Sequence, residues 1–318
     1  MSLSKLALCL RTTICQPQMK KKDKQTTSEI QILKKARHGS GGYNKELYTR
    51  VHRMIIEKPA NALRTTMDFL SCKWDERGEV IMPMELYDEN KIGLAKLKED
   101  VEIAHKWMAD NFHVCKADGR NDLGEMYRES DYPSEKEFRE RFFVEIEVLP
   151  VPIRVSSNHL HALLEQDKEM DKKAFRKMLD EAEADNLKCV TEQCAQRVYK
   201  ATEHIIDGID HKQRPRGSNA KRNATYHDSL VGHVWDLVQI LPKLNIGKSP
   251  EIDALHDALK SQILGKLRLD DVAKTDKEKR LKTEVAAMRE NVTLENEVKQ
   301  TASDIRKMAA AILPQTDN

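Results

Sequence analysis

The stretch DYPSEKEFRERFFVEIEVLPVPIRV, residues 131–155, contains the sharpest change of pattern in the chain. Helical spacing ends within it and an extended pattern begins. Asp131 or Ser134 can cap a short helix over residues 135–141, because each side chain can accept hydrogen bonds from the first free amides of a helix. We therefore predict a short helix that leads directly into a strand.

The strand is predicted over residues 142–149, where apolar and polar residues alternate with a period of two. Proline ends it, because a proline lacks an amide donor and biases the residue before it toward extended geometry. A lone strand leaves backbone groups unpaired, and a partner can complete them. The predicted protein interface therefore consists of Phe142, Val144, Ile146, Val148, Pro150 and Pro152.

Outside this stretch, apolar residues recur at spacings of three and four and predict helices. Long helices are expected over residues 89–114 and 276–313, and residues 158–211 are expected to form two helices or one bent helix. Ser249 followed by Pro250 marks the start of another helix, since serine caps helices and proline is favoured at the first helical position. Pro59 is expected to interrupt a helix that begins near residue 44.

These patterns predict a mainly α protein: an elongated helical bundle with long helices and a small β element near residues 142–149. Four parts are expected: a basic flexible arm (1–42), an N-terminal helical region (43–130), a helix–strand–proline insert (131–156) and a C-terminal helical bundle (157–318). Charged residues make up 33% of the chain and aromatic residues only 5%. That balance is typical of long helices with wide solvated faces rather than of a sheet enzyme with a deep apolar pocket.

The cysteines and the hydropathy indicate a soluble protein of a reducing compartment. Six cysteines occur without any CxxC pair, so we expect reduced thiols. No window approaches the ~20 apolar residues that a membrane span requires.

Charge is uneven along the chain. Residues 1–40 hold nine basic and two acidic residues, a net charge of +7, which leaves −5 for the remainder. Such runs can contact nucleic-acid phosphates, although they are more often solvated arms and loops. The candidate phosphate contacts are Lys20, Lys21, Lys22, Lys24, Lys212, Arg214, Arg216, Lys221 and Arg222.

Catalytic patterns are weak in this chain. The glycine-rich run at residues 39–42 has no following lysine and no preceding strand, so it does not fit a phosphate-binding loop. The pairs His227-Asp228 and His256-Asp257 are too short to define a metal site. We therefore expect no enzyme activity, no catalytic residue, no cofactor and no metal.

Two motifs carry a family resemblance. The first runs through Asp131–Ser134, Phe138–Phe142 and Leu149–Pro152, in the form DYPS…FRERF…LPVP. The second is LVxILPxLN at residues 237–245, preceded by Arg222-Asn223, Tyr226 and Asp228–Leu230. Together they resemble a domain family of unknown function found in phages and mobile elements, over roughly residues 40–300.

The resemblance implies partners rather than chemistry. Members of the family are often encoded beside a MoxR-type AAA+ ATPase and a protein with a von Willebrand A domain, so an accessory or adaptor protein in the cytoplasm of a bacterial host is expected. No catalytic residues are established for the family. Two alternatives stay open: a phage nucleic-acid-associated protein that binds through the basic segments, and a virion or assembly component that forms homo-oligomers through the arm and the last helix.

Overall fold

The computed structural model describes residues 6–37, 40–74, 78–151, 172–213 and 229–314. Helices hold 70% of the described residues, which confirms the mainly α prediction. No helix in these ranges is long and apolar enough to cross a membrane.

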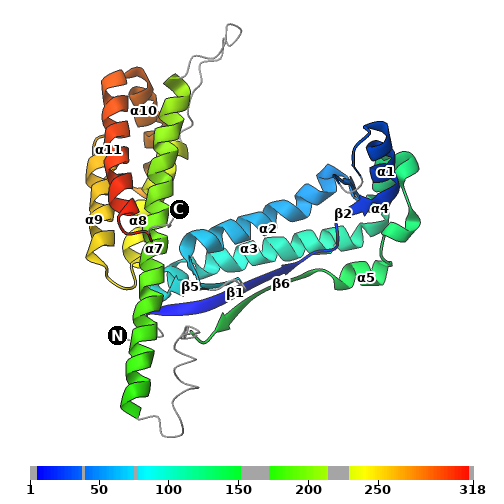
Figure 1. Ribbon diagram of the computed structural model, residues 1–318, viewed down its shortest axis with the longest axis horizontal. Coiled ribbons are helices and arrows are strands. Elements are labelled where there is room, and N and C mark those ends of the chain that lie inside the picture. The colour runs from blue at the N-terminus through cyan, green and yellow to red at the C-terminus, as the bar shows by residue number, and fades with distance from the viewer. Residues whose placement is uncertain (1–5, 38–39, 75–77, 152–171, 214–228, 315–318) are drawn as a thin grey trace.

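The first half of the chain combines helices with short strands (Figure 1). Its elements are β1 (Ala7–Cys15), β2 (Lys20–Asp23), α1 (Lys24–Leu33), β3 (Tyr43–Glu46), α2 (Arg50–Leu70), β4 (Cys72–Lys73), β5 (Glu79–Pro83), α3 (Met84–Asp110), α4 (Phe112–Leu123), α5 (Glu135–Glu140) and β6 (Phe143–Leu149). Two short turns, η2 (Gly124–Met126) and η3 (Glu129–Asp131), lie between α4 and α5.

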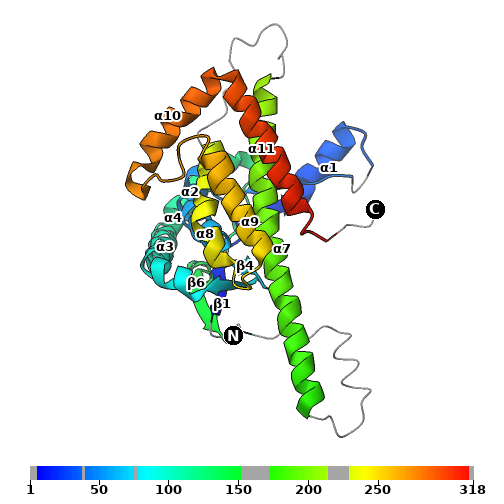
Figure 2. The same cartoon turned by 90° about the vertical axis from the view of Figure 1, so that its left-hand side faces the viewer.

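The second half is helical in its described ranges. Its elements are α7 (Lys172–Gln213), α8 (Ser229–Leu244), α9 (Pro250–Ala258), the π-helix η4 (Leu259–Leu264), the turn η5 (Lys274–Asp276), α10 (Lys277–Glu290) and α11 (Val292–Ala310). Figure 2 shows α9 and α11 lying along α7, while α10 stands off to one side.

The strands form a four-stranded antiparallel sheet in the order β4-β5-β1-β6 and a two-stranded sheet of β2 and β3. Strand β1 pairs with β5 over Ala7–Arg11 and with β6 over Cys9–Cys15. The expected flexible arm is therefore wrong for residues 7–15, which form an inner strand, and for residues 20–23, which form a second, paired strand. Because β1 occupies one edge of β6, the expected lone strand is also wrong.

Local signals located several helix boundaries. Ser134 caps α5 in a reciprocal capping box with Glu137, and Ser249 caps α9 with Pro250 at its start, both as predicted. Helix α2 continues through Pro59, where a break was expected. The last predicted helix is divided at Asn291, whose side chain accepts a hydrogen bond from the amide of Leu294 at the start of α11.

One large hydrophobic core joins the sheet to the C-terminal helices. It contains Cys9 and Leu10 of β1 together with Val198 of α7 and Ile305 of α11, all nearly fully buried. Helix α7 is the spine: α8, α9 and α11 pack along part of it, and α2, α3, β1 and β6 extend away from another part (Figure 1). The four predicted parts therefore do not correspond to separate cores, because the N-terminal strand belongs to the same core as the last helix.

A smaller cluster closes the far end of the α2–α3 pair. Its aromatic members are Tyr48, Phe112, Tyr132 and Phe138, and Phe138 is fully buried, with its ring centroid 4.5 Å from that of Phe112 and 5.6 Å from that of Tyr48. Tyr132 donates a hydrogen bond to the backbone oxygen of Leu47 at 2.6 Å. The DYPS…FRERF segment therefore folds around this cluster before the chain enters β6.

Candidate functional site

Strand β6 lies at one edge of the four-stranded sheet. Its inner edge pairs with β1, from Phe143 opposite Cys15 to Leu149 opposite Cys9. Within the described ranges no strand pairs with its other side. Since alternate residues of an edge strand point their N–H and C=O groups outward, these groups of residues 143–149 form an open row, here named the β6 edge.

The predicted interface residues divide between the core and the surface. Val144 is buried in the main core and Ile146 packs against that core. These two side chains were assigned to the partner surface, but they belong to the chain's own interior, because the pairing with β1 places this face of β6 against α3. Val148 is 56% exposed at the end of the strand.

The remaining predicted interface residues lie outside the strand. Phe142 precedes β6 and packs against Phe138, with ring centroids 5.1 Å apart and planes perpendicular. Pro150 is exposed directly after the strand, and Pro152 lies outside the described residues. The structure thus shifts the candidate site from an apolar side-chain face to the backbone edge and the opposite face of the strand.

That opposite face carries carboxylates. Phe143 is 47% exposed, Glu145 is exposed, and Glu147 is half-buried. Arg11 of β1 lies 3.7 Å from Glu147 between guanidinium and carboxylate, and it also contacts Glu79 of β5. Arg11 therefore pairs with two of the three carboxylates on this face, Glu79 and Glu147, and leaves the face acidic.

The N-terminal basic residues lie on a folded element rather than on a free arm. Lys20 forms an ion pair with Glu46 at 3.2 Å, and Lys21 forms one with Asp131 at 2.9 Å. Lys22 in β2 and Lys24 in α1 are exposed. Two of these four predicted phosphate contacts are thus already paired with acids of the same chain.

The second basic segment is described only at its start. Lys212 lies near the end of α7, while Arg214, Arg216, Lys221 and Arg222 lie outside the described residues. Of this segment, the described part of the chain therefore includes Lys212 alone among the predicted phosphate contacts.

A buried charge cluster was missed by the sequence analysis. Lys45, only 2% exposed, lies 3.1 Å from Asp23 and 2.5 Å from Asp131, and donates a hydrogen bond to the backbone oxygen of Met126 at 2.8 Å. The cluster ties the two-stranded sheet to the turn before α5. A single lysine in a basic, charged stretch gives no signal of this role.

The same cluster lowers two pKa values. The backbone amide of Thr26 holds the pKa of Asp23 below its usual range; burial opposes this, and Lys45 adds to the lowering. Burial alone would raise the pKa of Asp131, but hydrogen bonds from Lys45 and Lys21 outweigh it and the pKa is lowered. Both carboxylates are therefore charged partners of Lys45 at neutral pH.

A groove of about 500 Å³ lies between α2, α7 and α8 and was also not predicted. Arg197 of α7 lies at its side and donates hydrogen bonds of 2.6 Å to the backbone oxygens of Asp68 and Phe69, which caps the end of α2. The rings of His204 and His233 are 6.0 Å apart at the groove. These residues are dispersed in the sequence, so their proximity follows only from the packing of three helices.

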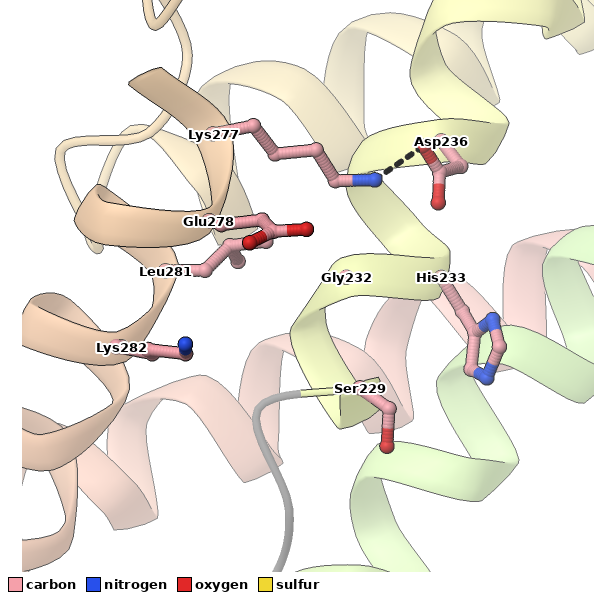
Figure 3. Close-up of a pocket in the computed structure, with 8 residues that line it drawn as sticks. All are labelled: Ser229, Gly232, His233, Asp236, Lys277, Glu278, Leu281 and Lys282. Carbon is pink, nitrogen blue, oxygen red and sulfur yellow. Dashed lines mark hydrogen bonds and ion pairs between the residues drawn. The ribbon is translucent and has the colours of Figure 1, made fainter. Parts of the chain in front are cut away.

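A smaller pocket of about 210 Å³ lies between α8 and α10 (Figure 3). Lys277 forms an ion pair with Asp236 at 2.5 Å and lies 4.8 Å from the centre of the Trp235 ring. In Figure 3 the His233 side chain points away from this ion pair. Among the described residues, no three His, Cys, Asp or Glu side chains are placed to hold a metal ion.

No protein-family model matches the chain, and neither the curated proteins nor the solved structures contain a match.

Proposed function

We propose that this is a non-enzymatic interaction protein that binds a partner along the β6 edge. The observation that carries the proposal is the position of β6: it is paired on one side with β1, and its other side has no strand partner within the described ranges. Proteins commonly use such an edge to add a strand from another chain, with backbone hydrogen bonds providing affinity and alternate side chains providing specificity.

The groove and the pocket give indirect support for the absence of enzyme activity in this proposal. Catalysis needs a nucleophile or base held in reach of a reacting atom, with its own orienting partner. In the described groove Arg197 is used to cap α2, and in the described pocket Lys277 and Asp236 neutralise one another. These charged groups therefore serve the packing of the helices.

The identity of the partner rests on the family resemblance alone. That resemblance supports an adaptor of a phage or mobile element that acts in a bacterial cytoplasm with a MoxR-type AAA+ ATPase and a von Willebrand A protein. In such a system the ATPase supplies the energy, and the adaptor supplies a folded surface.

Light scattering tests the proposal. The full chain is measured alone and mixed with a MoxR-type ATPase encoded beside it, with and without ATP. A nucleotide-dependent complex is expected. A large assembly of the chain alone that ignores the ATPase would contradict the adaptor function and favour a self-assembling component.

Two consecutive proline variants, Glu145→Pro and Ile146→Pro, test the edge itself. One of these amides points toward β1 and the other points outward, because the pattern alternates along the strand. The variant whose thermal denaturation stays closer to that of the wild type has lost an outward donor rather than a hydrogen bond to β1, as edge strands tolerate. We expect that variant to lose the complex; retained binding would remove β6 as the site.

A further inference from the structure

We infer that the segment that occupies the β6 edge is an extended, basic one, with two Lys or Arg residues two positions apart and apolar residues between and beside them. The inference rests on the proposed function, because it assumes that the edge binds a strand. It identifies the chemistry of that strand from the side chains that β6 presents on its two faces.

The acidic face of β6 determines where the added strand carries its basic residues. An added strand alternates its side chains between the same two faces as β6, so residues two apart lie opposite Glu145 and Glu147. Opposite charges directly across a ladder stabilise the pair, and like charges destabilise it. A strand with basic residues at these two positions therefore matches the face, and an acidic strand does not.

The two glutamates are not equivalent. Glu147 already lies 3.7 Å from Arg11, whereas Glu145 is exposed and is two residues closer to the α5 end of the strand. The basic residue opposite Glu145 therefore pairs with the carboxylate that is less neutralised by the chain itself. We expect Glu145 to contribute more to the preference than Glu147.

The other face sets the apolar positions. Val144 and Ile146 lie against the core, and Val148 is 56% exposed beside them. An apolar side chain on the added strand extends this face and covers Val148. The expected pattern is thus apolar–basic–apolar–basic–apolar over five residues, which fits within the seven-residue strand.

A second copy of this chain fits the edge poorly in the symmetric register centred on Ile146. In an antiparallel pair of two β6 strands centred on Ile146, each Glu145 lies directly opposite a Glu147 of the other copy. Both cross-strand pairs then join like charges on a face that is already acidic. That register of self-pairing is therefore disfavoured, whereas a basic segment meets both glutamates with opposite charge.

Fluorescence anisotropy with the full chain and labelled peptides tests the inference. The probes are the capped peptides TVKVKVT and TVEVEVT, titrated to millimolar protein concentration. We expect the lysine peptide to bind at least tenfold more tightly, and the difference to shrink as salt rises, because exposed charges are screened.

Glu145→Lys should abolish or reverse the preference between the peptides. The matched control is Glu290→Lys, since Glu290 is an exposed glutamate at the end of α10, far from the sheet. The control should keep the preference of the wild type. Binding of both peptides with equal affinity, or a preference that Glu145→Lys leaves intact, overturns the inference.

The proline variants distinguish a failure of the charge preference from a failure of the proposed strand binding. If the peptides bind equally and the tolerated proline variant abolishes both, the edge binds strands but without charge selection. If neither peptide binds, or both bind the tolerated proline variant as well as the wild type, the β6 edge is not a strand-binding site and both proposals fall.

Discussion

Lys45 shows how much of the fold depends on one side chain that the sequence does not mark. Replacing it with methionine, Lys45→Met, leaves Asp23 and Asp131 charged and buried without their shared partner. Breaking a buried ion pair in this way costs about 3–5 kcal/mol. Urea denaturation at pH 7 should show this loss, while Lys22→Met, at an exposed neighbour in β2, should change the free energy of unfolding by less than about 0.5 kcal/mol.

The same variant should depend on pH in a defined direction. The pKa values of Asp23 and Asp131 are lowered in the folded protein. Their stabilisation is therefore complete above the unfolded value of about 4 and is lost as the pH falls through the folded values. Thermal denaturation from pH 7 to pH 3 should show the wild type and Lys45→Met converging, and a constant gap would contradict the charge account.

Arg197 makes a second prediction at this scale. Its guanidinium donates to the backbone oxygens of Asp68 and Phe69, so Arg197→Ala leaves the end of α2 without these partners. Hydrogen bonds to a charged group contribute about 2 kcal/mol, and a comparable loss is expected in chemical denaturation. Lys200→Ala, one turn along the same groove, is the control, and an equal loss in both variants would show that the capping contacts are not responsible.

At the scale of elements, β1 is where the structure differs most from the flexible arm that the sequence predicted. Leu10 is fully buried in the sheet, so Leu10→Ala should lower the free energy of unfolding by about 3 kcal/mol. Leu33→Ala in α1, where the side chain is 78% exposed, should have almost no effect. Equal, small effects of both substitutions on the free energy of unfolding would contradict the buried strand and support the flexible arm that the sequence predicted.

The elements that the sequence located are those with strong local signals. Ser134 and Ser249 mark the starts of α5 and α9, because a cap needs only its own next few residues. Alternation located β6 to within one residue. Helix α2 was expected to break at Pro59, but the buried face from Ile56 to Leu63 holds it together despite a cost of about 3 kcal/mol for an internal proline.

The edge itself could not be derived from the sequence. Its definition requires β1, whose leucines also fit helical spacing, and β1 pairs with strands far along the chain, from Arg11 with Glu79 to Cys9 with Leu149. Local patterns carry no information on such pairing. The acidic face has the same origin, since Arg11, Glu79 and Glu147 meet only after the three strands align.

At the scale of the whole molecule, the helical spine and the sheet form one unit. The main core runs from Cys9 in β1 to Ala309 in α11, so the helices that pack on α7 also hold the inner part of the sheet. The outer part of β1 and β6 extends beyond α7, between that helix and α5 (Figure 1). The proposed binding role requires such an edge strand, held by the core and extending away from the bulk of the protein.

The apolar stripe of the last helix has its partner within the chain. Val298, Ala302 and Ile305 of α11 are buried, and α11 packs along α7. Self-assembly through this stripe, one of the alternatives from the sequence, would therefore have to displace contacts of the core. The β6 edge needs no such displacement among the described residues.

Residue-resolved amide hydrogen exchange of the isolated protein over residues 143–149 tests the central claim most directly. An edge strand paired only with β1 should show slow and fast amides in strict alternation, because every second N–H is free to exchange with water. That alternation is the predicted result. Uniformly slow exchange along the strand would show that its outer side is already covered, and would contradict an open β6 edge.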